Sequence, residues 1–87
     1  MIERSVTIRN ELGLHARPAA KFVRLASSFK SAVEVEREGQ AVNGKSIMGV
    51  MMLSAECGAV VTIRADGDDA EAAVEALHRL VDGGFDE

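Results

Sequence analysis

Two side chains in the first third of the sequence, His15 and Arg17, could act together on one substrate. They lie two residues apart, where we expect the first helix to begin. A stable helix start has Ser, Thr, Asp or Asn as its cap and acidic residues in its first turn. Here a histidine takes the expected cap position and an arginine lies in the first turn. This departure from the stable pattern indicates a functional site for an anion.

The chemistry that fits these residues is phosphoryl transfer to His15. A neutral imidazole is a nucleophile toward phosphorus, and both the positive end of a helix and Arg17 disfavour a protonated ring. The N–H groups of Ala16 and Arg17, together with the guanidinium, could bind the phosphoryl oxygens. We therefore expect His15 to be the covalent acceptor and Arg17 the stabilising cation.

The expected last helix has the opposite charge pattern. Acidic residues, Asp68, Asp69 and Glu71, lie at its start, and His78 and Arg79 lie near its end. Both placements are favoured by the helix dipole, so we expect an acidic cap there and no further role for His78. Because the chain stabilises this helix in the usual way, helix stability does not explain Arg17.

Two alternative chemistries are disfavoured. Zinc usually takes four ligands, whereas the chain has only two histidines and one cysteine, so we expect neither a metal nor another cofactor. Residues Gly39–Ser46 match the phosphate-binding pattern G-x-x-x-x-G-K-[ST]. However, the preceding strand alternates with glutamates, unlike a strand buried in a parallel sheet, and Gln40–Val42 is predicted to be a strand itself. Nucleotide binding is therefore the weaker hypothesis.

A second candidate site begins at Ser46. This serine can cap a short helix that ends near Leu53, or it can be phosphorylated, since a helix N-terminus tolerates added negative charge. The helix has apolar residues on more sides than one buried stripe can absorb, and exposed methionines suit a surface with several partners. A basic face on the first helix, with Arg17, Lys21 and Arg24 at helical spacing, suggests an acidic protein partner or an anionic group. For Lys21 and Arg24 alone, an ordinary solvated polar face is the favoured alternative. The expected partner interface comprises Ala20, Lys21, Arg24, Ile47, Met48, Met51 and Met52.

The amino-acid composition and net charge limit the classes of protein to which this chain can belong. The 87 residues are 47% hydrophobic, with a net charge of −4, one cysteine and no Trp or Tyr. The acidic balance argues against nucleic-acid binding, and no apolar run approaches the ~20 residues that span a membrane. We expect a single domain over residues 1–87, in the cytoplasm and without membrane insertion.

Hydrophobic periodicity predicts the elements that position these sites. Residues 2–8, 33–36, 40–42 and 60–65 alternate as strands, although Arg4 breaks the first pattern. Apolar stripes at spacings of three and four predict one helix whose buried face runs from Ala19 to Phe29 and another over residues 70–81, with the Ser46 helix between them. The order β-α-β-β-α-β-α predicts an α+β fold, an antiparallel sheet with helices packed on one face.

Two motifs resemble one known family. Residues Leu12–Ala19 are similar to the active-site signature of the HPr family, the histidine phosphocarriers of the bacterial phosphoenolpyruvate-dependent phosphotransferase system. Residues Asn43–Met51 are similar to that family's regulatory-serine segment, and the ending Gly84–Glu87 also fits. The resemblance covers essentially the whole chain and implies an open-faced β-sandwich, a four-stranded antiparallel sheet with three helices.

The resemblance also implies roles and partners. His15 would take phosphate on Nδ1 from phosphorylated enzyme I and pass it to an enzyme II component of the A type, with Arg17 stabilising the group. HPr kinase/phosphorylase would modify Ser46 and so weaken docking to enzyme I. The chain would be a phosphohistidine carrier rather than a stand-alone enzyme. The alternative is a regulatory role in the nitrogen-related branch, NPr, toward which Leu12 and the ending Phe85–Glu87 lean.

Overall fold

Four strands form one antiparallel sheet in this computed structural model, which describes residues 1–87. The order across the sheet is β1-β4-β2-β3, so the last strand along the chain lies between the first and the second. The elements, in chain order, are β1 (Ile2–Thr7), α1 (Ala16–Ser27), β2 (Ala32–Arg37), β3 (Gln40–Asn43), α2 (Ile47–Met52), β4 (Val60–Asp66), α3 (Ala70–Asp82) and a C-terminal 3-10 turn, η1 (Gly84–Asp86).

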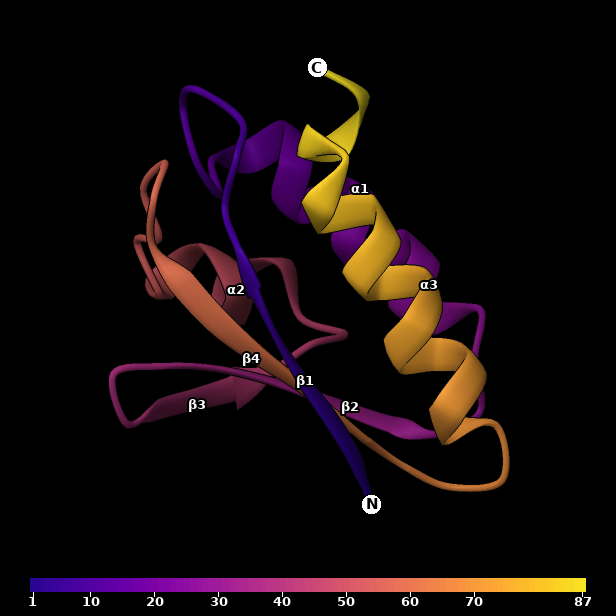
Figure 1. The fold of residues 1–87 in the computed structure, drawn as a ribbon. Helices are drawn as coiled ribbons and strands as arrows, with labels where there is room; N and C mark the ends of the chain where they lie inside the picture. Colours follow the sequence, from indigo (N-terminus) through magenta and orange to yellow (C-terminus); the bar gives the residue numbers. More distant parts are fainter.

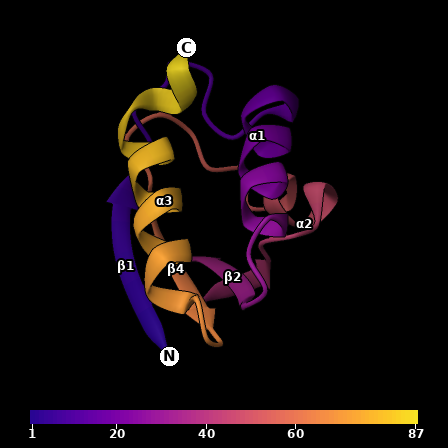
Figure 2. The ribbon, with the colours of Figure 1, turned by 90° about the vertical axis from the view of Figure 1, so that its right-hand side faces the viewer.

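The three helices cover one face of this sheet and leave the other open (Figures 1 and 2). In the central strand β4, Val61 and Ile63 face the helices, and they pair with Val6 of β1 and Val35 of β2. Because side chains alternate between the two faces of a strand, one apolar residue in two is enough to build the core. The predicted α+β open-faced β-sandwich, with its order β-α-β-β-α-β-α, is confirmed.

The helices contribute their apolar stripes to the same core. In α1 the buried residues include Ala19, Phe22 and Ala26, with Val23 at the margin. The expected stripe extends to Phe29, but the helix ends at Ser27 and Phe29 packs against the core from the loop that follows. The stripe of α3 is fully buried and comprises Ala70, Ala73, Val74, Leu77 and Val81. The core therefore holds both helices against the sheet and fixes where each of them begins.

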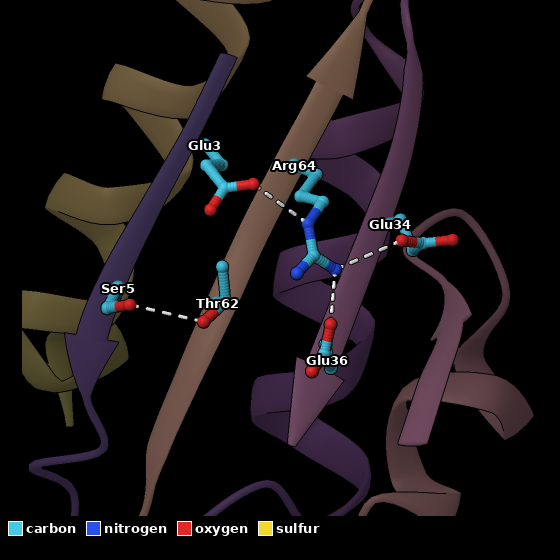
Figure 3. A network of polar contacts seen from close by, with 6 residues as sticks. All are labelled: Glu3, Ser5, Glu34, Glu36, Thr62 and Arg64. Atoms are coloured by element: carbon cyan, nitrogen blue, oxygen red, sulfur yellow. Dashed lines mark hydrogen bonds and ion pairs between the residues drawn. The ribbon is translucent and has the colours of Figure 1, made fainter. Parts of the chain in front are cut away.

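The open face of the sheet is polar and is organised around Arg64 (Figure 3). Its guanidinium lies 3.0 Å from a Glu3 oxygen on β1, and 3.2 and 2.5 Å from oxygens of Glu34 and Glu36 on β2. The hydrogen bonds that Arg64 donates to the carboxylates of Glu36 and Glu3 raise its pKa above the usual range. The glutamates that alternate along β2 thus line a solvated face, as the period-2 pattern predicts.

The start of α3 differs from the sequence prediction. Asp69 is the N-cap residue, but its carboxylate makes no capping bond. It instead accepts the N–H groups of Lys30 and Ser31, each at 2.9 Å, and the hydroxyl of Ser31. The N–H groups of Lys30 and Ser31 have no other acceptor, so the carboxylate joins the loop before β2 to the loop before α3 instead of capping the helix.

No helix of the structure combines the length and the apolar character that crossing a membrane requires.

Candidate functional site

His15 is the N-cap residue of α1, as the sequence predicts. Its backbone is extended, with φ −80° and ψ −172°, and its carbonyl accepts the N–H of Ala19 at 3.0 Å. The side chain makes no capping hydrogen bond, and no acidic residue lies in the first turn. The helix start is therefore formed by the backbone alone.

The two N–H groups that follow have no acceptor. In the first turn of an α-helix the N–H groups lack intrahelical partners, and a cap side chain normally satisfies one of them. Here the N–H groups of Ala16 and Arg17 donate to nothing, and the third position, Pro18, has no N–H. The Arg17 side chain is exposed and makes no ion pair or hydrogen bond. Three donor groups without acceptors, two backbone N–H groups and one guanidinium, thus belong to adjacent residues.

The two ring nitrogens of His15 have different environments. Nε2 is buried, makes no hydrogen bond, and lies 3.6 Å from Oε1 of Glu87. Nδ1 also makes no hydrogen bond, but it is not buried, and the side chain is 37% exposed. The accessible nitrogen, free to react, is therefore Nδ1, while a carboxylate faces the other side of the ring.

Glu87 is brought to His15 by the C-terminal turn, at the end of the molecule where α1 begins (Figure 1). Phe85 is fully buried and adopts φ 58°, which folds the chain back over the core. Lys21 of α1 donates from Nζ to the carbonyl of Phe85 at 2.6 Å. Lys21 is half-buried and holds this turn, so the expected basic face of α1 has only Arg17 and Arg24 fully exposed.

The loop before His15 is fixed by contacts that sequence reasoning did not single out. Nδ2 of the buried Asn10 donates to the carbonyl of Gly13 at 2.6 Å, and the N–H of Leu14 donates to the carbonyl of Ala55 at 2.8 Å. Gly13 has φ +70°, and a Cβ there would lie 2.3 Å from the Ala55 oxygen, so only glycine fits. The spacing Asn-x-x-Gly is a turn signal that could have identified Asn10. No local signal identifies Glu87, which is far along the chain.

Ser46 caps α2, as predicted. Its Oγ accepts the N–H of Gly49 at 3.1 Å, and the side chain is half-buried. Four apolar residues of α2 are exposed, most of all Met48 at 76% and Met52 at 64%, with Ile47 and Met51 less so, whereas Val50 is buried. The α2 surface (Ile47, Met48, Met51 and Met52) is therefore an apolar patch on the outside of the molecule.

The segment that matches a nucleotide-binding loop has a different structure. Gln40–Asn43 forms β3, which pairs antiparallel with β2 from Gln40↔Arg37 to Asn43↔Glu34. A phosphate-binding loop needs free N–H groups after a parallel strand, whereas β3 engages its backbone in the sheet. The geometry does not support a nucleotide site here.

None of the surface depressions is lined by His15. One of about 600 Å³ lies beside it, between the loop after β1 and the end of α3, and its lining includes Asn10 and Glu87. One of about 500 Å³ lies at the Ala32 and Asp66 ends of β2 and β4, and the third lies between α1 and α3. His15 thus lies on an open surface, where a second protein can reach it but a small substrate is not enclosed.

Comparison with known proteins agrees with the fold. The family model described as the PTS HPr component phosphorylation site matches residues 2–82. The phosphocarrier protein HPr of Cupriavidus necator is 49% identical over 87 residues, which cover all of this chain and 98% of that protein. A crystal structure of HPr from Thermoanaerobacter tengcongensis superposes with a TM-score of 0.96 at 49% identity, covering 100% of this chain and 98% of that one. The chain belongs to the HPr family of phosphocarriers of the phosphotransferase system.

The same comparisons bear on the nitrogen-related alternative. The phosphocarrier protein NPr of Shewanella violacea is 42% identical over 86 residues, covering 99% of this chain and 94% of that protein. The identity to HPr of Cupriavidus necator is higher, at 49%. The HPr interpretation is favoured over the NPr interpretation.

Proposed function

We propose that this chain accepts a phosphoryl group on Nδ1 of His15 from phosphorylated enzyme I and passes it to an A-type enzyme II component in the cytoplasm. The observation that supports this most strongly is the start of α1, where an accessible Nδ1 lies beside two N–H groups without acceptors. Family membership supports the reaction class, and the geometry at the start of α1 supports the choice of His15 and Arg17.

The chemistry of the transfer is a displacement at phosphorus. The lone pair of Nδ1 forms the new N–P bond while the bond from phosphorus to the donor protein breaks, and Nε2 keeps its proton throughout. The ring then carries a positive charge, which the Glu87 carboxylate 3.6 Å from Nε2 stabilises. The N–H groups of Ala16 and Arg17, with the Arg17 guanidinium, hold the phosphoryl oxygens. The second transfer is the reverse displacement, toward the acceptor protein.

The docking surface in this proposal combines α1 and α2. Ala20, Lys21 and Arg24 lie on the first helix beyond the site, and the exposed α2 surface supplies apolar contact area. Flexible methionines pack against differently shaped partners, which suits a carrier that binds a donor and then an acceptor. Lys21 contributes through its stem, because its amine is engaged with Phe85.

Ser46 is the regulatory site in this proposal, modified by HPr kinase/phosphorylase where that enzyme is present. Its hydroxyl caps α2 directly beside the methionines. A phosphate adds about −1.5 to −2 charges at this position, so an acidic face of enzyme I would dock less tightly.

Phosphate uptake from enzyme I and labelled phosphoenolpyruvate tests the proposal. The parent protein should take up label that is labile to acid and stable to base, and His15→Ala should take up none. His78→Ala is the matched control, because His78 is the only other histidine and lies near the end of α3. Label on His15→Ala at the parent level would overturn the assignment of His15.

A further inference from the structure

We infer that Asn10 is a positioning residue for phosphoryl transfer, which keeps the N–H of Arg17 available to the phosphoryl group by engaging the carbonyl of Gly13. This inference rests on the proposed function of His15. It assigns a role to a buried side chain outside the motif that surrounds the acceptor.

The geometry joins Asn10 to the helix start through one carbonyl. Nδ2 of Asn10 donates to the Gly13 oxygen at 2.6 Å, and the N–H of His15 donates to the same oxygen at 3.0 Å. The Asn10 carbonyl accepts the N–H of Gly13 at 3.1 Å, so side chain and backbone close the turn together. The Gly13 oxygen therefore already has two donors.

That oxygen is the acceptor that the N–H of Arg17 would have if α1 began one turn earlier. In an α-helix each N–H donates to the carbonyl four residues earlier, and for Arg17 that residue is Gly13. With the Gly13 carbonyl engaged by Asn10 and His15, the N–H of Arg17 has no acceptor in the structure. The Asn10 amide thus competes with Arg17 for this acceptor and, together with the φ of +70° at Gly13, opposes extension of α1 backward by one hydrogen bond.

This arrangement leaves one polar atom of the Asn10 amide without a hydrogen-bond partner. Only Nδ2 can donate to a carbonyl, so the contact with Gly13 fixes the orientation of the amide and leaves Oδ1 buried without a partner. Asn10 is only 6% exposed, and a buried acceptor without a hydrogen bond destabilises the fold. A residue that served stability alone would not leave this atom unpaired, whereas one that holds a carbonyl away from Arg17 has to orient its amide in this way.

Two variants test the inference. Asn10→Ala removes the amide, and Asn10→Asp keeps its shape but places an acceptor where the donor was. We expect both to lower kcat for phosphorylation by enzyme I about tenfold with KM unchanged, because one hydrogen bond to a charged group is lost in the transition state. In the unphosphorylated variants the Arg17 amide should exchange more slowly with solvent, since it can then donate to Gly13.

Amide NMR shifts separate this role from a general loss of stability. On phosphorylation of the parent the Arg17 amide proton should move downfield, and in both Asn10 variants this shift should be smaller. Ser31→Ala is the destabilised control, because Ser31 is buried at the far end of the molecule against Asp69, and it should keep the parent's kcat and amide shift. If both Asn10 variants keep the parent's kcat and Arg17 shift, the inference is wrong even where His15→Ala has confirmed the acceptor. If the parent takes up no phosphate, the proposed function fails instead.

Discussion

His15 takes a position in α1 where Ser, Thr, Asp or Asn would stabilise the helix by about 1 kcal/mol. Its ring makes no capping bond, and the following N–H groups of Ala16 and Arg17 stay without acceptors. Asn10 adds a buried oxygen without a partner. These polar groups without partners all lie within eight residues of the sequence, around the accessible Nδ1 of His15. Such a concentration is typical of a site maintained for chemistry rather than for stability.

Asp69 shows the opposite behaviour of a polar side chain. Hydrogen bonds from the Ser31 hydroxyl and from the Lys30 and Ser31 N–H groups lower its pKa from 3.8 to about 2. A carboxyl whose pKa is lower in the folded state contributes stability that is present above pH 3.8 and lost as the pH falls through about 2. Asp69 therefore contributes to stability at neutral pH and ceases to do so in acid.

We expect Asp69→Asn to lower the free energy of unfolding near neutral pH and to flatten its decline between about pH 5 and pH 2. Urea unfolding at a series of pH values measures both effects. Asp68→Asn is the matched control, since the neighbouring Asp68 carboxylate accepts no hydrogen bond, and it should keep the slope of the parent protein. An Asp69→Asn variant whose unfolding free energy declines in acid as steeply as the parent's would contradict this account.

At the scale of the elements, α2 is the helix that depends most on its surroundings. It has only six residues, fewer than an isolated helix needs in water. The Ser46 cap and the buried Val50 and Leu53 hold it in place, which leaves its methionines free to face solvent. A short helix held at its ends can present a large apolar surface without contributing to the core on every side.

We predict that Ser46→Asp slows phosphorylation by enzyme I while changing stability little. Asp is as good an N-cap as Ser, so α2 should persist, whereas the added negative charge beside the α2 surface opposes docking. The rate of label uptake and the urea midpoint, measured on the same sample, distinguish these effects. Gln40→Glu adds a charge on the exposed strand β3 and should phosphorylate at the parent's rate. Equal rates for Ser46→Asp and the parent would remove the regulatory role.

Periodicity predicted the elements well and their side-chain partners poorly. The alternation in β2 and β4 and the stripes of α1 and α3 placed the core correctly, because burial repeats at the period of the backbone. The partners of Asp69 and Lys21 could not be predicted this way. Each joins segments at least 38 residues apart in the sequence, and that proximity exists only after the fold has formed.

The candidate site could likewise be predicted only where the signal lies within one segment of the sequence. His15 and Arg17 could be identified because they break local rules of helix stability, which is a signal within one segment. Glu87 could not be identified as a neighbour of the ring, because it reaches His15 only through the buried Phe85 turn. Asn10 had a turn signal, but its effect on Arg17 depends on which carbonyl its amide reaches.

In the whole molecule, the core that stabilises the fold and the candidate phosphoryl-transfer site lie in different regions. One side of the sheet carries the helices and the core, and the other carries the Arg64 network in solvent (Figure 3). The start of α1 lies at one end of the helical layer, and the loop after α2 contacts it through Leu14 and Ala55. A carrier must bind, hold and release the same group, and a helix end that is open on one side permits all three steps.

The proposed function depends most directly on which atom carries the phosphoryl group. Phosphorylation of ¹⁵N-labelled protein by enzyme I, followed by NMR detection of coupling between ³¹P and ¹⁵N, identifies that atom. We predict coupling to Nδ1 of His15 and to no other side-chain nitrogen. Coupling to Nε2 of His15, to a nitrogen of His78, or to no nitrogen at all would contradict the proposed function.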